Sequence, residues 1–234
     1  MKTPISDFVK QYAASGKSRF HMPGHKGKSF VGCESIDITE INGADILGDA
    51  SGIIAQSEKN ASDLFKSAHT FYSTEGSSLS IKAMLALIKK KSAKNERTKI
   101  LASRNVHKAF VYACALLDLD VEWIYPNDIS DLYSYHISPQ ELRAKINSLE
   151  SVPNAFYITS PDYLGNMSDI KGLSEVCHEY NIPLLVDNAH GAYLSFLDES
   201  QHISAPRSRG CIDSSRNERY APCALSTSSG MLYS

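Results

Sequence analysis

Apolar positions change their spacing several times along the chain and predict strands that alternate with helices. The predicted strands are residues 99–102, 121–125, 155–159 and 183–186. The predicted helices between them are residues 106–117, 139–149 and 170–180. Short strands separated by helices of this length are typical of βαβ units, so we predict an α/β fold with a mostly parallel sheet and helices on both faces. The run 183–186 is apolar throughout, as expected of a strand that is buried on both faces.

Upstream of this alternation the pattern is less regular. Residues 1–55 are rich in turns, with one short helix at 5–14, and read as an N-terminal arm. A helix at 57–68, an extended piece at 70–73 and a turn at 75–78 follow. An apolar helix at 79–88 ends in three lysines, which suit the negative end of the helix dipole.

The last segment, residues 200–234, carries four arginines and many serines, and it shows no sustained apolar period. We therefore divide the chain into the arm (1–55), a partial sheet-forming major domain (56–199) and an irregular tail (200–234). We expect the sheet to be incomplete at the C-terminus and the tail to be a non-native ending, such as a frameshift or truncation would produce. A genuine disordered tail is the competing explanation.

Composition narrows the class of partner. The 24 Lys and Arg against 26 Asp and Glu leave a net charge of −2, so no long-range field favours nucleic acid or an anionic membrane. The N-terminus has no apolar core of signal-peptide length, no stretch elsewhere approaches the length of a membrane span, and we expect a cytoplasmic protein. The five cysteines are widely spaced and include no CxxC pair, which argues against a disulfide framework or a zinc site.

Polar residues that follow the predicted strands are the candidates for chemistry, because ligands of parallel α/β sheets bind at the carboxyl ends of strands. Gly76, Ser77 and Ser78 precede an apolar helix and could cradle a phosphate, or simply cap the helix. Asp187 ends the most apolar strand and could hold a protonated ring nitrogen, coordinate a metal or cap a turn. His190, three residues later, could hydrogen-bond the same ligand.

Three further histidines have open roles. His107 lies near a predicted helix start and could stack on an aromatic ligand, or it could be an ordinary surface histidine. His21 and His25 have the four-residue spacing of a helical metal pair, but Pro23 and Gly24 between them break a helix. We expect no metal site.

Six motifs occur in one order along the chain. They are Phe20–Gly27 (FHMPGHKG), Asp37–Glu40 (DITE), Gly76–Ser78 (GSS), Arg104–Lys108 (RNVHK), Ser160–Tyr163 (SPDY) and Asp187–Gly191 (DNAHG). In this order they resemble the major domain of the ornithine/lysine/arginine decarboxylases, over about residues 18–200. Members of that family are pyridoxal 5′-phosphate (PLP) enzymes with the aspartate-aminotransferase fold, fold type I.

The resemblance implies PLP as cofactor and a role for each matching residue. Gly76, Ser77 and Ser78 match the loop that holds the phosphate, and His107 matches the histidine that stacks on the pyridine ring. Asp187 matches the aspartate that pairs with the ring nitrogen, and His190 the histidine near the ring hydroxyl. The segment from His21 to Lys26 matches a stretch close to the active site.

For the whole family the resemblance implies decarboxylation of arginine, lysine or ornithine to the amine, as in polyamine metabolism. It also implies a homodimer or a higher oligomer.

The sequence departs from the pattern of this family in three places. Asn188 and Tyr193 replace residues of a DEAHGAH segment, and Glu75 stands where asparagine is more usual. The largest departure is the Schiff-base lysine, which the family carries in a Ser-x-His-Lys segment after the aspartate, whereas the last lysine here is Lys171. We therefore expect this polypeptide to be an inactive form. The alternatives are another fold type I enzyme, an aminotransferase or amino-acid lyase, and a non-catalytic fragment that binds PLP or a partner.

Overall fold

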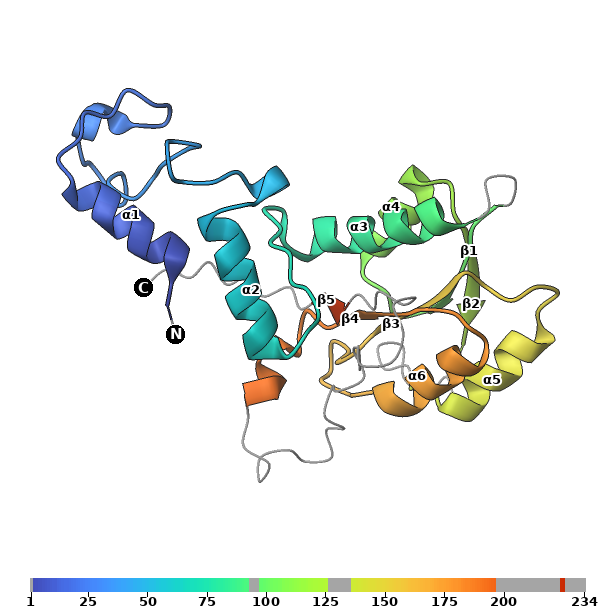
Figure 1. Cartoon of the computed structure of the whole chain (residues 1–234). Coiled ribbons are helices and arrows are strands. Elements are labelled where there is room, and N and C mark those ends of the chain that lie inside the picture. Colours follow the sequence, from blue (N-terminus) through green and yellow to red (C-terminus); the bar gives the residue numbers. More distant parts are fainter. Residues whose placement is uncertain (1, 93–96, 126–135, 197–223, 226–234) are drawn as a thin grey trace. The chain divides into compact units, whose positions relative to one another are not determined.

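The computed structural model describes residues 2–92, 97–125, 136–196 and 224–225 (Figure 1). The chain divides into two compact units, Met1–Tyr72 and Ser73–Ser234. The first unit therefore includes the helix at the start of the predicted major domain. No helix among the described residues has the length and apolar character that a bilayer crossing needs.

The first unit contains two α-helices, α1 (Pro4–Ala14) and α2 (Ile53–Phe65), which pack against each other. Two short 3-10 helices, η1 (His25–Gly27) and η2 (Leu47–Asp49), lie in the segment between them. Helix α2 begins and ends earlier than the predicted 57–68. It ends at Phe65 because Lys66 adopts a left-handed conformation (φ 55°).

Two carboxylates hold the loops of this unit. Glu34 accepts hydrogen bonds from the backbone N–H groups of Phe30, Val31 and Gly32 at 2.7–2.8 Å. These bonds, that of Val31 first, lower the pKa of the Glu34 carboxyl to about 2. Asp45 accepts from four backbone N–H groups around the start of α2, and its pKa is likewise lowered to about 2, with the bond from Ser51 the largest cause.

The extended piece predicted at 70–73 is wrong as a strand, because these residues pair with no other strand among the described residues. The backbone N–H of Tyr72 instead donates to the Glu58 carboxylate at 2.8 Å, and the Tyr72 hydroxyl lies 2.8 Å from that of Ser57. The Glu58 carboxylate on α2 thus satisfies a backbone N–H that a strand ladder would have used.

The second unit is built on a parallel sheet in the order β2-β1-β3-β4-β5. The strands are β1 (Lys99–Ser103), β2 (Asp120–Ile124), β3 (Ala155–Thr159), β4 (Leu184–Asp187) and β5 (Ala224–Leu225). The predicted α/β fold with a parallel sheet is confirmed. Of the predicted tail at 200–234, only the two residues of β5 lie within the described part of the chain.

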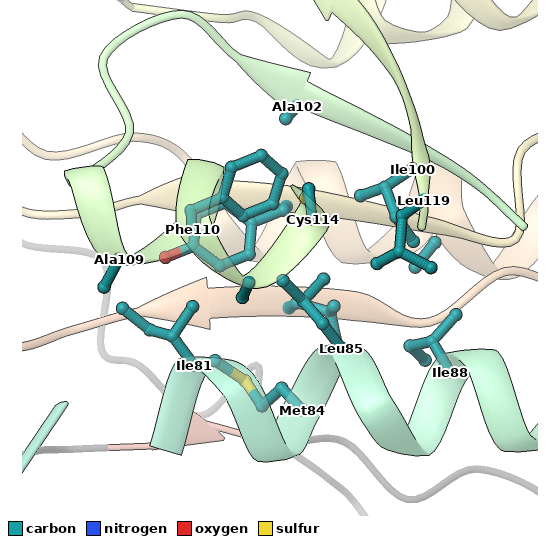
Figure 2. Packing of buried hydrophobic residues seen from close by; sticks show 14 residues of the cluster. Ile81, Met84, Leu85, Ile88, Ile100, Ala102, Ala109, Phe110, Cys114 and Leu119 are labelled. Carbon is teal, nitrogen blue, oxygen red and sulfur yellow. The ribbon is translucent and has the colours of Figure 1, made fainter. Parts of the chain in front are cut away.

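Helices cover both faces of this sheet. They are α3 (Gly76–Lys91), α4 (Lys108–Leu116), α5 (Pro139–Ser148) and α6 (Ile170–Glu179). Successive strand residues point to opposite faces, and two apolar clusters result. One joins α3 and α4 to alternate strand residues, among them Ile100, Tyr157 and Leu185, as seen in part in Figure 2. The other joins α5 and α6 to the intervening residues, among them Leu101 and Phe156.

Low pH should weaken the hydrogen bonds that hold the loop at residues 30–32 to the Glu34 carboxylate. The pKa of Glu34 lies below its ordinary value of 4.5, so its ionised form stabilises the fold above that pH, and this contribution is lost as the pH falls through about 2. Hydrogen exchange should show protection of the Phe30, Val31 and Gly32 amides falling across this range. The substitution Glu34→Gln should abolish that pH dependence there and leave the amides bound to Asp45 unaffected. An unchanged pH dependence at residues 30–32 in the variant would contradict the assignment.

Candidate active site

The carboxyl ends of the strands and the first turns of α3 and α4 share one edge of the second unit. Each of these helices returns the chain to the amino end of the next strand, so each must begin at the carboxyl edge. Figure 2 shows this directly: Ile81 and Ala109, near the two helix starts, lie at one end of the core, and Ile88 and Leu119 lie at the other.

The first turn of α3 has the features of an anion cradle. The helix begins at Gly76 rather than at the predicted residue 79, so Ser77 and Ser78 contribute backbone N–H groups that a first helical turn leaves unpaired. Glu75 at the N-cap position makes no side-chain capping bond, and its carboxylate lies 3.7 Å from the Lys82 ammonium. Among the described residues, the Ser77 and Ser78 hydroxyls make no hydrogen bond.

Asp187 is the last residue of β4 and is only 4% exposed. Since side chains alternate along a strand, it shares the face of Leu185, which packs with α3 and α4. Its Oδ2 accepts a hydrogen bond from the Tyr157 hydroxyl at 3.2 Å, and its Oδ1 accepts from the Ala189 backbone N–H at 3.2 Å. The structure thus brings Asp187 to the edge and face where α3 begins.

Tyr157 is a site residue that the sequence analysis missed. It is fully buried, and its ring centroid lies 4.3 Å from that of Phe110 on α4. Burial raises the pKa of the Tyr157 phenol well above its usual range, and the negative charge of Asp187 raises it further. The available signal was a tyrosine inside an otherwise apolar strand, because a buried hydroxyl needs a hydrogen-bond partner.

His107 caps α4 at the same edge. Its Nδ1 accepts a hydrogen bond from the Ala109 backbone N–H at 3.1 Å, which turns the ring toward the helix start. Nearby, the Ser103 hydroxyl donates to Asn105 Oδ1 at 2.9 Å.

Two buried polar atoms of the second unit, Asn105 Nδ2 and Thr159 Oγ1, have no hydrogen-bond partner among the described residues. Thr159 ends β3 opposite Asp187 in the register, and Asn105 follows β1. Unpaired buried polar atoms are uncommon, and both of these lie at or just after the carboxyl end of a strand.

His190 is exposed, and its ring lies 5.3 Å from that of Tyr163. The loop that carries Tyr163 is held by Asp162, whose Oδ1 accepts from the backbone N–H groups of Leu164 and Asn166 at 2.9 Å. His190 therefore lies beyond Asp187, on the turn that follows β4, and it is not buried with that carboxylate.

The other two candidate histidines belong to the first unit. His21 Nε2 lies 3.0 Å from the Tyr12 hydroxyl, and His25 Nε2 lies 2.8 Å from an oxygen of Asp37. The described residues contain no group of three or more His, Cys, Asp or Glu side chains that could hold a metal ion.

Close packing explains why the last residue of the DNAHG motif is glycine. A Cβ atom at Gly191 would lie 2.6 Å from Pro161 Cδ and closer still to Asn188 Oδ1. The turn after Asp187 therefore closes tightly on the loop after β3, and only glycine fits there without displacing these neighbours.

Together, a parallel sheet, an open helix start and a buried carboxylate at the strand ends are typical of α/β proteins that bind an anionic ligand at the carboxyl edge. Residues 3–208 match the family described as Orn/Lys/Arg decarboxylase, major domain, and the chain belongs to this family. The resemblance noted from the motifs is confirmed. PLP is the cofactor of that family, which confirms the cofactor expected from the sequence.

Several known proteins are similar to this chain. Arginine decarboxylase of Bacillus subtilis (strain 168) is 30% identical over 208 residues, 85% of this chain and 41% of that protein. Arginine decarboxylase of Halalkalibacterium halodurans is 32% identical over 209 residues, 83% of this chain and 41% of that protein. The constitutive lysine decarboxylase of E. coli shares the fold, with a TM-score of 0.65 and 20% identity over 84% of this chain and 30% of that one. The chain thus spans about 41% of the length of the two arginine decarboxylases.

Replacing Gly191 should disturb the turn after Asp187. Gly191→Ala places a methyl group against Asn188 and Pro161, and overpacking of this kind costs about 1–3 kcal/mol of the free energy of unfolding. Urea unfolding followed by circular dichroism measures the loss. Gly48→Ala is the control, because a Cβ there meets no atom within 4 Å. Equal stabilities of the two variants would show that the turn does not need glycine.

Proposed function

We propose that this chain carries the PLP-binding part of a decarboxylase that converts a basic amino acid, arginine, lysine or ornithine, to its amine. The observation that supports this most is the common position of the α3 start and the buried Asp187 carboxylate, on one edge and one face of the sheet. PLP carries both a phosphate arm and a ring nitrogen, so it needs an anion cradle and a carboxylate that face the same ligand.

The residues of this edge fit that cofactor. The free N–H groups of the first α3 turn and the Ser77 and Ser78 hydroxyls would bind the phosphate, favoured by the positive end of a 16-residue helix. Asp187 would hold the proton at the ring nitrogen, because a buried carboxylate favours a positive charge beside it. His107 would lie against the ring, and His190 near the ring hydroxyl.

When bound, PLP supplies an electron sink that stabilises the charge left at the substrate α-carbon by loss of CO₂. The chain's own contribution at this edge is to bind the phosphate of the cofactor and to keep its ring nitrogen protonated.

The proposal concerns the 234 residues by themselves, which supply no Schiff-base lysine to the proposed site. The 234 residues contain no lysine after Lys171, so none follows Asp187 in this chain. Arginine cannot replace it, because a Schiff base needs a primary amine. We therefore expect the 234-residue polypeptide to bind PLP without a covalent bond and to lack decarboxylase activity by itself.

The family also suggests a cellular location and an oligomeric state for the protein. We propose a cytoplasmic protein that assembles as a homodimer or a higher oligomer, in line with the expectations from sequence. An aminotransferase or another lyase of fold type I is the alternative reaction, and a non-catalytic PLP-binding fragment is the alternative role. The arginine decarboxylase relatives, at 30–32% identity, favour the decarboxylase family over the alternative reactions.

Titration of the 234-residue protein with PLP, followed by fluorescence and checked by equilibrium dialysis, tests the proposal. We expect saturable binding that weakens about tenfold in Asp187→Asn and about tenfold in the double variant Ser77→Ala/Ser78→Ala, since each loses charge-assisted hydrogen bonds. Ser148→Ala, an exposed serine on α5, is the matched control and should bind like the wild type. No binding by the wild type, or equal binding by all variants, would contradict the proposed site.

Borohydride reduction followed by peptide mass spectrometry tests the second part of the proposal. We expect no lysine to retain the cofactor. A reduced adduct on any lysine, Lys108 beside His107 included, would overturn non-covalent binding while leaving the binding site itself in place.

A further inference from the structure

We infer that Tyr157 is a positioning residue that fixes the Asp187 carboxylate for the ring nitrogen of the cofactor, an inference that rests on the proposed function. The sequence motifs do not include Tyr157. Its assignment comes from the contacts of its hydroxyl and of its ring.

The two oxygens of Asp187 are held from two directions. Oδ2 accepts from the Tyr157 hydroxyl on β3, and Oδ1 accepts from the Ala189 backbone N–H in the turn after β4, each at 3.2 Å. Two donors on different oxygens fix the rotation of the carboxylate. An ionised carboxylate has about four acceptor sites, so an oxygen remains able to accept from a ligand N–H.

Tyr157 is itself held rigidly. Its ring packs 4.3 Å from that of Phe110, centroid to centroid, and no part of the side chain reaches solvent. Phe110 lies in the first turn of α4, where its backbone N–H donates to the His107 carbonyl at 2.9 Å. A chain of buried contacts therefore joins the helix start that carries His107 to the carboxylate at the end of β4.

The hydroxyl acts as a donor in this arrangement. Because burial and the neighbouring carboxylate keep the phenol protonated, the hydrogen bond runs from Tyr157 to Asp187. Phenylalanine would fill the same core space, as Phe156 does on the opposite face. The hydroxyl is therefore not needed for packing, and orienting Asp187 is the function that its contacts support.

A double-mutant cycle on PLP affinity separates positioning from a general structural role. Tyr157→Phe should weaken PLP binding about tenfold in the wild-type background, the effect of losing one hydrogen bond to a charged group. In the Asp187→Asn background the same substitution should change the affinity less than about twofold, because the carboxylate that Tyr157 orients toward the ring nitrogen is gone. Tyr180→Phe removes a hydroxyl that bonds Asn147 and is the matched control, expected to have no effect.

A cofactor analogue provides a second test. The probe is 1-deazapyridoxal 5′-phosphate, in which a C–H group replaces the ring nitrogen. The wild type and Tyr157→Phe should bind this probe equally, within about twofold, because the interaction that Tyr157 supports no longer exists. Unequal binding of the probe would show that the substitution disturbs the site as a whole.

A conservative replacement covers the case in which Tyr157→Phe does not fold. 3-Fluorotyrosine placed at position 157 keeps the hydroxyl and should retain PLP affinity within about twofold. Its ¹⁹F resonance should move when PLP is added and move much less with the deaza probe. Equal movement with both ligands would overturn the inference.

The outcomes distinguish failure of the proposed function from failure of the positioning role of Tyr157. If the wild type does not bind PLP, the proposed function fails and this inference fails with it. If PLP binds through Asp187 but the Tyr157→Phe effect is the same in both backgrounds, only the positioning role is overturned.

Discussion

The parallel register of β3 and β4 is the constraint on which the candidate site depends. It pairs Thr159 with Asp187 and Tyr157 with Leu185, so the tyrosine and the aspartate, two register positions apart, project from the same face of neighbouring strands. A slip of one residue would turn Asp187 toward α5 and α6 and remove the partner of the Tyr157 hydroxyl. The apolar layers on both sides resist such a slip, because it would expose core residues of both clusters.

Most of the sheet could be predicted because the apolar pattern of each strand is strong and lies within a few consecutive residues. The strand at 155–159 matches β3, and the other three predicted strands lie within one residue of β1, β2 and β4 at each end. The start of α3 could not be predicted, since glycine and serine are weak helix formers that the pattern reads as a turn. The strand expected at 70–73 failed because its β-propensity has no neighbouring strand to pair with, and strand formation requires one.

Some residues of the candidate site could likewise be predicted from the sequence, and others could not. Asp187 stood out from sequence because a carboxylate ends an apolar run, and the carboxyl-edge rule gave that position meaning. Tyr157 did not, because the apolar pattern counts tyrosine as a core residue and contains no information about its hydroxyl. His190 illustrates the limit of a motif: matching the family pattern says nothing of burial, and the ring lies exposed beside Tyr163. The roles of these residues toward PLP come from the family and stay proposals.

¹⁵N NMR of PLP labelled at its ring nitrogen and bound to the 234-residue protein tests the placement of the cofactor against Asp187 most directly. We expect a resonance of the protonated ring nitrogen, which persists at pH values where the free cofactor has lost that proton and disappears in Asp187→Asn. A bound cofactor whose ring nitrogen loses its proton at the same pH as the free molecule would contradict the placement of PLP against Asp187.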